Sequence, residues 1–193
     1  MAIREIIEVP DPRLKLVSDP YQEHEFDDEL KTLVDDMFET MYDAPGIGLA
    51  AIQIAIPKRL LVIDLQEPDM DAEPIVEECG DGCCEPTTRQ PTKKVPRVFI
   101  NPEVFDFSEE LASCQEGCLS IPEIFADVER PAECSVKYQD LDGSFHEERV
   151  TGMLATCLQH EMDHLNGILF TDHLSRLKRN MAMKKLKKIR AAA

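Results

Sequence analysis

The chain has 193 residues, 43% of them hydrophobic, and its 21 Lys and Arg against 38 Asp and Glu give a net charge of −17. This length predicts one domain over residues 1–193, and the hydrophobic fraction is enough for a core, which argues against a disordered protein. No apolar run is long enough for a transmembrane helix. The first residues lack the apolar run of a signal peptide, and we therefore expect a cytoplasmic protein.

Three helices are expected from the spacing of apolar residues, and the first covers residues 27–42. Apolar residues recur there every three or four positions, which is the period of a helix with one buried face. A second helix follows Thr151, which is its expected N-cap. The third is expected at about 173–190.

Four strands are expected from short apolar or alternating runs. Residues 60–65 predict a buried strand, and residues 98–104 predict another that Pro102 interrupts. The remaining two form a hairpin around an Asp-Gly turn, at 135–138 and 145–150.

The segment 66–97 differs in composition from its surroundings. It holds five Pro, eight acidic residues and three of the seven Cys, with little hydrophobic periodicity. This pattern is typical of a long surface loop inserted between two strands. Its cysteines, Cys79, Cys83 and Cys84, have no matching Cys or His pair nearby, so a zinc site there is not favoured.

The charge of the chain is unevenly distributed. Residues 176–190 contain eight Lys or Arg and no acid, whereas the remainder holds 13 basic against 38 acidic residues. We therefore expect nucleic acid to repel the body of the protein but not this basic C-terminal helix. A solvated helix end is the simpler interpretation.

The strongest chemical signal is His160-Glu161-Met162-Asp163-His164. On a helix, positions i and i+4 lie on one face, so the two imidazoles can bind one ion such as Zn²⁺ or Fe²⁺. Glu161 can then reach a water molecule on that ion. The alternative is a chance pattern of surface residues, but the motif continues an apolar stripe, where uncompensated charge is costly.

A third ligand is needed, and the downstream sequence does not offer one at the spacings of the common metalloproteases, since Phe170 stands where one family has a third His. The ligand is therefore expected upstream. A thiolate suits Zn²⁺ or Fe²⁺, and Cys118 follows a glycine that allows close backbone approach. Spacing alone does not separate Cys118 from Cys114 or Cys134, or from a buried and unreactive thiol.

Three blocks in this order resemble the signature sequences of the peptide deformylase family. They are Gly46-Ile-Gly-Leu-Ala-Ala-Ile-Gln53, Glu116-Gly-Cys-Leu-Ser120 and Gln159-His-Glu-Met-Asp-His164, and Pro10-Asp-Pro-Arg13 near the start is also similar. The resemblance covers nearly the whole chain except residues 66–97, a segment longer than is usual in that family.

The resemblance implies an α+β fold in which antiparallel or mixed strands surround a central helix that carries the HExxH motif, with a further C-terminal helix. It implies Cys118, His160 and His164 as ligands of one divalent ion. In that family the native ion is Fe²⁺, and isolated enzymes also contain Zn²⁺ or Ni²⁺.

The resemblance also implies a reaction, the hydrolytic removal of the N-formyl group from the initiator methionine of newly made polypeptides, with release of formate. Water bound to the metal would attack the formyl carbon while Glu161 acts as general base and then general acid. Gln53 and the Leu119 backbone N–H would be the oxyanion donors. Gly48 is placed with these catalytic residues.

Substrate contacts are expected from the first block and from the helix with the HExxH motif. Ile47, Met153 and Cys157 would form the apolar pocket for the methionine side chain, although each suits a plain core position equally well. Gly46 and Gly48 would leave the backbone beside Ile47 free to pair with an extended peptide. By the same resemblance, the basic C-terminal helix would dock on the ribosome.

Two other functions are compatible with parts of this pattern. A general metallopeptidase would use the same helix motif, but the Cys ligand and the lack of a downstream ligand argue against it. A catalytically silent ribosome-binding protein would be free to lose the metal ligands, Glu161 and Gln53, all of which are present.

Overall fold

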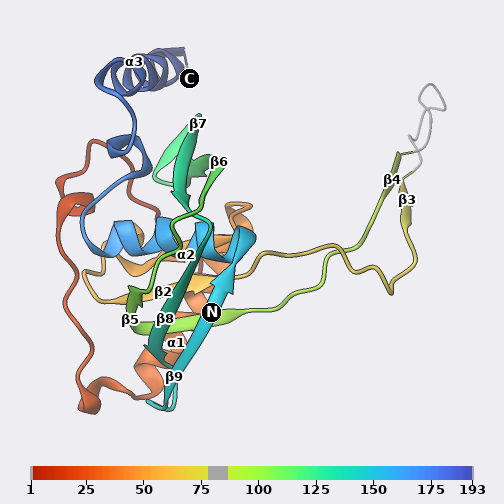
Figure 1. The fold of residues 1–193 in the computed structure, drawn as a ribbon, viewed down its shortest axis with the longest axis vertical. Coiled ribbons are helices and arrows are strands. Elements are labelled where there is room, and N and C mark those ends of the chain that lie inside the picture. Colours follow the sequence, from red (N-terminus) through yellow and green to blue (C-terminus); the bar gives the residue numbers. More distant parts are fainter. Residues whose placement is uncertain (1, 78–86, 193) are drawn as a thin grey trace.

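The computed structural model describes residues 2–77 and 87–192, and its body is an antiparallel sheet with a helix on each face (Figure 1). The helices are α1 (Asp28–Asp43), α2 (Gly152–Leu165) and α3 (Arg176–Ala192). The five strands of the sheet run in the spatial order β1 (Gly48–Ala50), β2 (Leu60–Ile63), β5 (Arg97–Phe105), β8 (Glu133–Gln139) and β9 (Phe145–Thr151). Four short 3₁₀ turns are η1 (Pro12–Lys15), η2 (Glu23–Glu25), η3 (Ala51–Ile54) and η4 (Phe170–Asp172).

Strand β2 explains why the sheet carries a helix on both faces. All four of its residues are buried. Leu61 and Ile63 belong to the core that α2 covers, whereas Leu60 and Val62 belong to the core that α1 covers. Because side chains alternate between the faces of a strand, an unbroken apolar run is the pattern of a strand buried on both sides.

Strand β5 is interrupted where the sequence predicts. Its pairing with β8 changes register between Ile100 and Glu103, on either side of Pro102, and Asn101 takes a left-handed backbone with φ of 50°. Proline has no N–H to donate to the neighbouring strand, so the ladder breaks at this point.

A second layer is formed by β6 (Leu111–Cys118) and β7 (Ile121–Pro131), which pair only with each other. Helix α3 packs on β7 through an apolar cluster. The cluster includes Ile121, Ile124 and Val128 of β7 with Ala182, Met183, Leu186 and Ile189 of α3. The helix therefore buries one apolar stripe, while its Lys and Arg residues remain largely on the exposed side.

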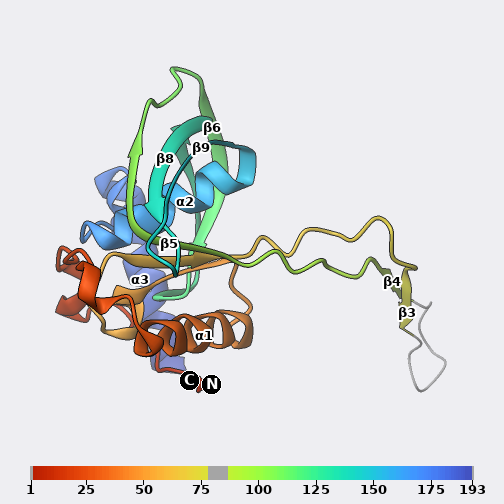
Figure 2. The same ribbon diagram turned by 90° about the horizontal axis from the view of Figure 1, so that it is seen from below.

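The remaining pair, β3 (Ile75–Glu77) and β4 (Thr87–Arg89), lies in the segment 66–97. We call this segment the arm, because in both views its described residues extend away from the rest of the chain (Figure 1, Figure 2). Within the arm, β3 and β4 pair as a short antiparallel ribbon, which the sequence did not predict. Cys79, Cys83 and Cys84 lie outside the described residues.

The predicted α+β class is confirmed, with antiparallel strands around a central α2 and a C-terminal helix. The first and second helices begin and end close to their expected positions, and Thr151 occupies the N-cap of α2, although its side chain makes no capping hydrogen bond. Strands β1, β6 and β7 were not predicted. None of the helices in the described ranges is long and apolar enough to cross a membrane.

Candidate metal and catalytic centre

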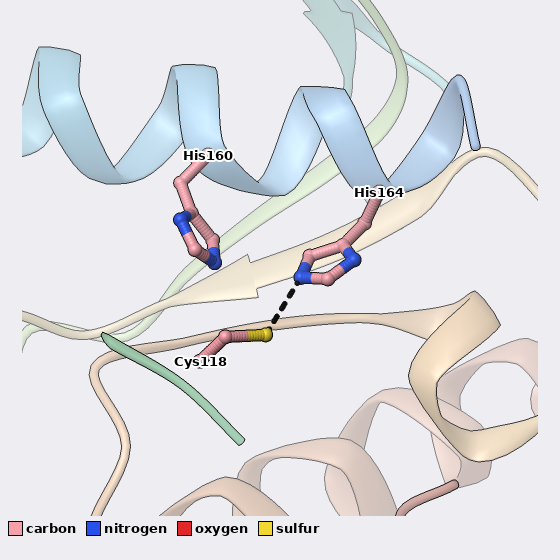
Figure 3. A group of neighbouring side chains, drawn as sticks. All are labelled: Cys118, His160 and His164. Atoms are coloured by element: carbon pink, nitrogen blue, oxygen red, sulfur yellow. Dashed lines mark hydrogen bonds between the residues drawn. The ribbon is translucent and has the colours of Figure 1, made fainter. Parts of the chain in front are cut away.

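Helix α2 and the end of β6 bring one thiol and two imidazoles together. His160 and His164 are one turn apart on the same face of α2, and Cys118 is the last residue of β6 (Figure 3). One ligand atom from each of the three residues lies within 4.8 Å of the other two. The Cys118 Sγ is 3.2 Å from the His164 Nε2. Both imidazoles are buried because α2 lies between the five-stranded sheet and the β6–β7 pair.

A buried charged network fixes the orientation of His160. Its Nδ1 is hydrogen-bonded to the Oε2 of Glu116 at 2.7 Å. Arg130 donates to the same carboxylate through Nε (2.5 Å) and Nη2 (3.0 Å), and to Asp163 through Nη1 (2.9 Å). Glu116 and Arg130 therefore form a buried ion pair beside Cys118. Because Nδ1 is engaged, the Nε2 of His160 is the nitrogen left for an ion.

The site shifts the pKa values of its own groups. Burial lowers the pKa of His160, but hydrogen bonds with Cys118 and Glu116 outweigh burial and hold that pKa well above its usual value. Burial, followed by the nearby charges of His160 and Arg130, holds the pKa of His164 well below its usual value, which favours the neutral form that a metal ligand must have. Burial raises the pKa of Glu116, but hydrogen bonds from His160 and Arg130 bring it to about 2.

Glu161 is a buried carboxyl group with one free oxygen. Its side chain is 3% exposed, and its Oε2 has no hydrogen-bond partner within the described residues. Burial raises the pKa of Glu161 to about 7. Gly48 is its close neighbour, since a Cβ on Gly48 would lie 2.6 Å from the Glu161 Oε1. A carboxyl group with this pKa can both take and return a proton near neutral pH.

Gln53 is oriented at both ends of its carboxamide. The backbone N–H of Ala50 donates to its Oε1 at 2.9 Å. Its Nε2 donates to the Ser120 Oγ (3.2 Å) and lies 3.6 Å from the Cys118 Sγ. The amide hydrogens of Gln53 therefore point toward the thiol and not into solvent. The sequence assigned no role to Ala50 or Ser120, although both lie within the matched blocks.

These groups lie around one cavity of about 650 Å³. Every expected site residue except His164 contributes to its wall: Gly46, Ile47, Gly48, Gln53, Cys118, Leu119, Met153, Cys157, His160 and Glu161. Ile47 is 38% and Met153 49% exposed, whereas Cys157 is buried with its Sγ 3.8 Å from the Ile47 carbonyl oxygen. Phe125, which the sequence did not single out, also lines the cavity and is 64% exposed.

The donor set fits a divalent transition-metal ion. It combines one thiol, two imidazoles that each offer a nitrogen close to that thiol, and a nearby carboxyl oxygen with no hydrogen-bond partner among the described residues. Soft sulfur and borderline imidazole ligands suit Fe²⁺, Ni²⁺ and Zn²⁺. Of the other two candidate thiols, Cys134 is buried in the core under α2, and Cys114 lines the cavity but is not part of the group of Cys118, His160 and His164.

Comparisons with known proteins agree on one family. The sequence model of "Polypeptide deformylase" matches residues 3–180. The chain is 70% identical to the peptide deformylase of Erythrobacter litoralis, with 100% of each chain covered. Its fold matches the crystal structure of a peptide deformylase from Legionella pneumophila with a TM-score of 0.80, at 41% identity and coverage of 99% and 97%. It also matches the peptide deformylase of Ehrlichia chaffeensis in complex with actinonin, with a TM-score of 0.79, at 39% identity and coverage of 97% and 98%.

Proposed function

Because the chain belongs to the polypeptide deformylase family, we propose that it removes the N-formyl group from the initiator methionine of newly made polypeptides and releases formate. The observation that carries this proposal is the group Cys118, His160 and His164 beside the partnerless oxygen of Glu161. Residues 1–193 would act as one catalytic domain, with the arm as an insertion. Because its proposed substrates are newly made polypeptides, we expect the protein to act in the cytoplasm.

Cys118, His160 and His164 would hold the metal ion. When bound, a divalent ion supplies Lewis-acid chemistry, since it lowers the pKa of a water molecule and so provides a nucleophile at neutral pH. Fe²⁺ is the native ion that we propose, and the same donor set accepts Zn²⁺ and Ni²⁺.

Glu161 is the proton carrier in this proposal. Its Oε2 accepts a proton from the attacking water and later delivers that proton to the nitrogen of the departing amine. Burial supports both steps, because a carboxyl pKa of about 7 leaves the group able to exist in either form near neutral pH.

The formyl oxygen gains negative charge as the carbon is attacked, and this charge needs donors that are already in position. We assign this role to the Gln53 Nε2 and to the backbone N–H of Leu119. The Ala50 N–H holds the Gln53 carboxamide by its oxygen, so that its nitrogen faces the site. Gly48 contributes by its small size, because a side chain there would collide with Glu161.

The residues that line the cavity suit the side chain and the acyl group of the proposed substrate. Ile47, Met153 and Cys157 offer an apolar surface for the methionine side chain, and all three line the cavity. A formyl group carries only hydrogen where larger acyl groups carry carbon, so a close-fitting site would accept formyl and exclude most others by size. Strand β1 lies at the edge of the sheet, where an extended peptide can add as a further strand beside Gly46 and Gly48.

Helix α3 would dock the enzyme on the ribosome. Its apolar stripe is used against β7, which leaves most of its Lys and Arg side chains exposed for ribosomal RNA. Exchange of Lys187 and Lys188 for Glu should weaken co-sedimentation with ribosomes and leave hydrolysis of a short peptide intact. Equal co-sedimentation of the two proteins would contradict this role.

The deciding experiment is formate release from a formyl-Met tripeptide, with the acetyl-Met tripeptide as control. The protein is prepared without oxygen and loaded separately with Fe²⁺, Ni²⁺ and Zn²⁺. Formate from the formyl peptide alone supports the proposal, and the ranking of the ions tests Fe²⁺. Cleavage inside the peptide would favour a general metallopeptidase. No release despite one bound equivalent of metal would favour a silent ribosome-binding protein.

A further inference from the structure

We call the point where the two legs of the arm leave the sheet, at residues 64–66 and at Val95, the root of the arm. One buried carboxylate holds this root against the body. Asp64 is fully buried directly after β2. Its Oδ1 accepts the backbone N–H of Gln66 (3.0 Å) from the outgoing leg of the arm and that of Val95 (3.1 Å) from the returning leg. Its Oδ2 accepts the hydroxyl of Tyr42 on α1 at 2.5 Å. One side chain therefore holds both legs of the arm against the first helix.

The same root also holds the edge of the cavity. The Gln66 Nε2 donates to the carbonyl oxygen of Gly46 at 3.0 Å. The Asp64 N–H donates to the carbonyl oxygen of the next residue, Ile47, at 2.9 Å. Gly46 and Ile47 both line the cavity. Two consecutive carbonyl groups of this edge are thus fixed from the arm side.

The opposite side of this edge is in close contact with the reaction centre. A Cβ on Gly46 would lie 2.8 Å from the Leu119 Cδ1, so little space separates the edge from the segment that carries Cys118. The edge therefore has little freedom to move toward Leu119. On its other sides the edge is held by the Gly46 N–H, which donates to the Met41 carbonyl oxygen at 2.9 Å, and by the Gln66 hydrogen bond to the Gly46 carbonyl oxygen.

The backbone of Gln66 indicates that its side chain is needed here. Its φ is 49°, in the left-handed region that glycine adopts without cost and other residues rarely adopt. A strained backbone at a residue with a defined contact points to a function for that contact. The contact that the Gln66 side chain makes is the hydrogen bond to the Gly46 carbonyl oxygen.

We propose that Gln66 is a positioning residue that holds the Gly46–Ile47 edge ready to receive the peptide, so that the root of the arm sets the affinity for substrate. This inference rests on the proposed function for the identity of the peptide. Without the bond, the Gly46 carbonyl group is less ordered before the peptide binds, and the cost of ordering it is subtracted from affinity. The ligands and Glu161 lie on α2 and β6, so turnover of bound substrate depends less on Gln66.

The test is Gln66→Glu, which keeps size but places a carboxylate against the Gly46 carbonyl. For a formyl-Met tripeptide we expect KM to rise about tenfold and kcat to change by less than about threefold. The matched control is Gln90→Glu. The Gln90 Nε2 donates to the carbonyl oxygens of Asp69 (2.5 Å) and Ala72 (2.8 Å) within the arm, so the control makes the same chemical change away from the cavity.

A wild-type KM in Gln66→Glu, or an equal rise of KM in Gln90→Glu, would overturn the inference. A second variant, Gln66→Gly, covers the case in which the carboxylate disturbs folding. Glycine adopts the left-handed backbone without cost, and it removes the hydrogen-bond donor to Gly46. This variant should therefore raise KM without lowering Tm. Amide hydrogen exchange over residues 44–50 provides a readout independent of activity. It should be faster in Gln66→Glu than in Gln90→Glu, and equal rates would count against Gln66. If the wild-type protein releases no formate, the proposed function fails, while hydrogen exchange still tests the role of Gln66.

Discussion

Replacement of Arg130 by Met tests the network behind the metal ligands. The Arg130 side chain is 5% exposed and binds Glu116 through two nitrogens and Asp163 through a third. Met has a similar length but no charge, so the change leaves the Glu116 carboxylate buried with its hydrogen bond to His160 but without the guanidinium. Asp163 is 16% exposed and keeps its contact with His173 at 2.7 Å, so the larger loss is at Glu116.

Removal of one partner from a buried ion pair costs about 3–5 kcal/mol in unfolding free energy, because the other charge stays buried and unpaired. For a chain of this length, about 1 kcal/mol corresponds to about 2–4 °C in Tm. We therefore expect Arg130→Met to lower Tm by about 6–20 °C. Thermal unfolding of metal-free protein gives the direct measurement, and metal-loaded protein measured in parallel separates the effect of the ion.

The double variant Arg130→Met with Glu116→Gln is the control. It removes the unpaired charge and keeps a neutral oxygen near the His160 Nδ1, so it should lose less stability than the single variant. Two results would refute this reasoning. One is that Arg130→Met lowers the free energy of unfolding by less than about 1 kcal/mol. The other is that the double variant is less stable than Arg130→Met.

The same network makes a prediction about pH. Because the pKa of Glu116 is lowered to about 2, its contribution to stability is present above the usual carboxyl pKa and is lost as pH falls from about 4.5 toward 2. Arg130→Met raises the pKa of Glu116 toward its unfolded value, so the variant should lose less stability than the wild-type protein as pH falls from about 4.5 toward 2. Identical pH profiles for the two proteins would contradict this assignment.

Three further predictions concern single side chains. Glu161→Gln should bind one equivalent of metal as the wild-type protein does and lose at least about 10²-fold in kcat, and full activity would exclude the proposed proton carrier. Gly48→Ala should lower kcat about 10²-fold in a folded protein, because its Cβ displaces Glu161; comparison of kcat with the circular dichroism spectrum checks this. The pKa of Asp36 is lowered mainly by the hydrogen bond from the Ala2 N–H and then by Arg4. Its contribution to stability is therefore present above a pH of about 4 and is lost in acid. Asp36→Asn should lack this pH dependence, as measured by denaturant titrations at several pH values.

The parts of the fold that depend on local periodicity could be predicted from the sequence. Helices α1 and α2 follow from the spacing of apolar residues, and His160 and His164 follow from the geometry of one helical turn. Cys118 lies 46 residues before His164, and no local pattern links positions on a strand and a helix so far apart. Only the resemblance to a family separated Cys118 from the other thiols.

Strands β6 and β7 were missed for a physical reason. In β6 the one buried residue is Glu116, a carboxylate, whereas the strand pattern expected from sequence alternates apolar and polar residues. The network with His160 and Arg130 compensates its burial, and that network exists only in the folded protein. The contact between Gln66 and Gly46 joins a side chain to a carbonyl group, and such contacts leave no periodic signal.

The position of the arm has a consequence for how the chain can vary in length. The arm joins β2 and β5, which pair directly with each other, and a bridge between Pro68 and Thr92 closes its two legs again. The entropy of closing a loop grows only slowly with its length, so residues added or removed beyond that bridge change the stability of the body very little. Segments of this kind are sites where insertions are tolerated. Insertions and deletions beyond this bridge should therefore be tolerated. Insertions or deletions near Asp64 and Gln66 would disturb the hydrogen bonds that hold the cavity.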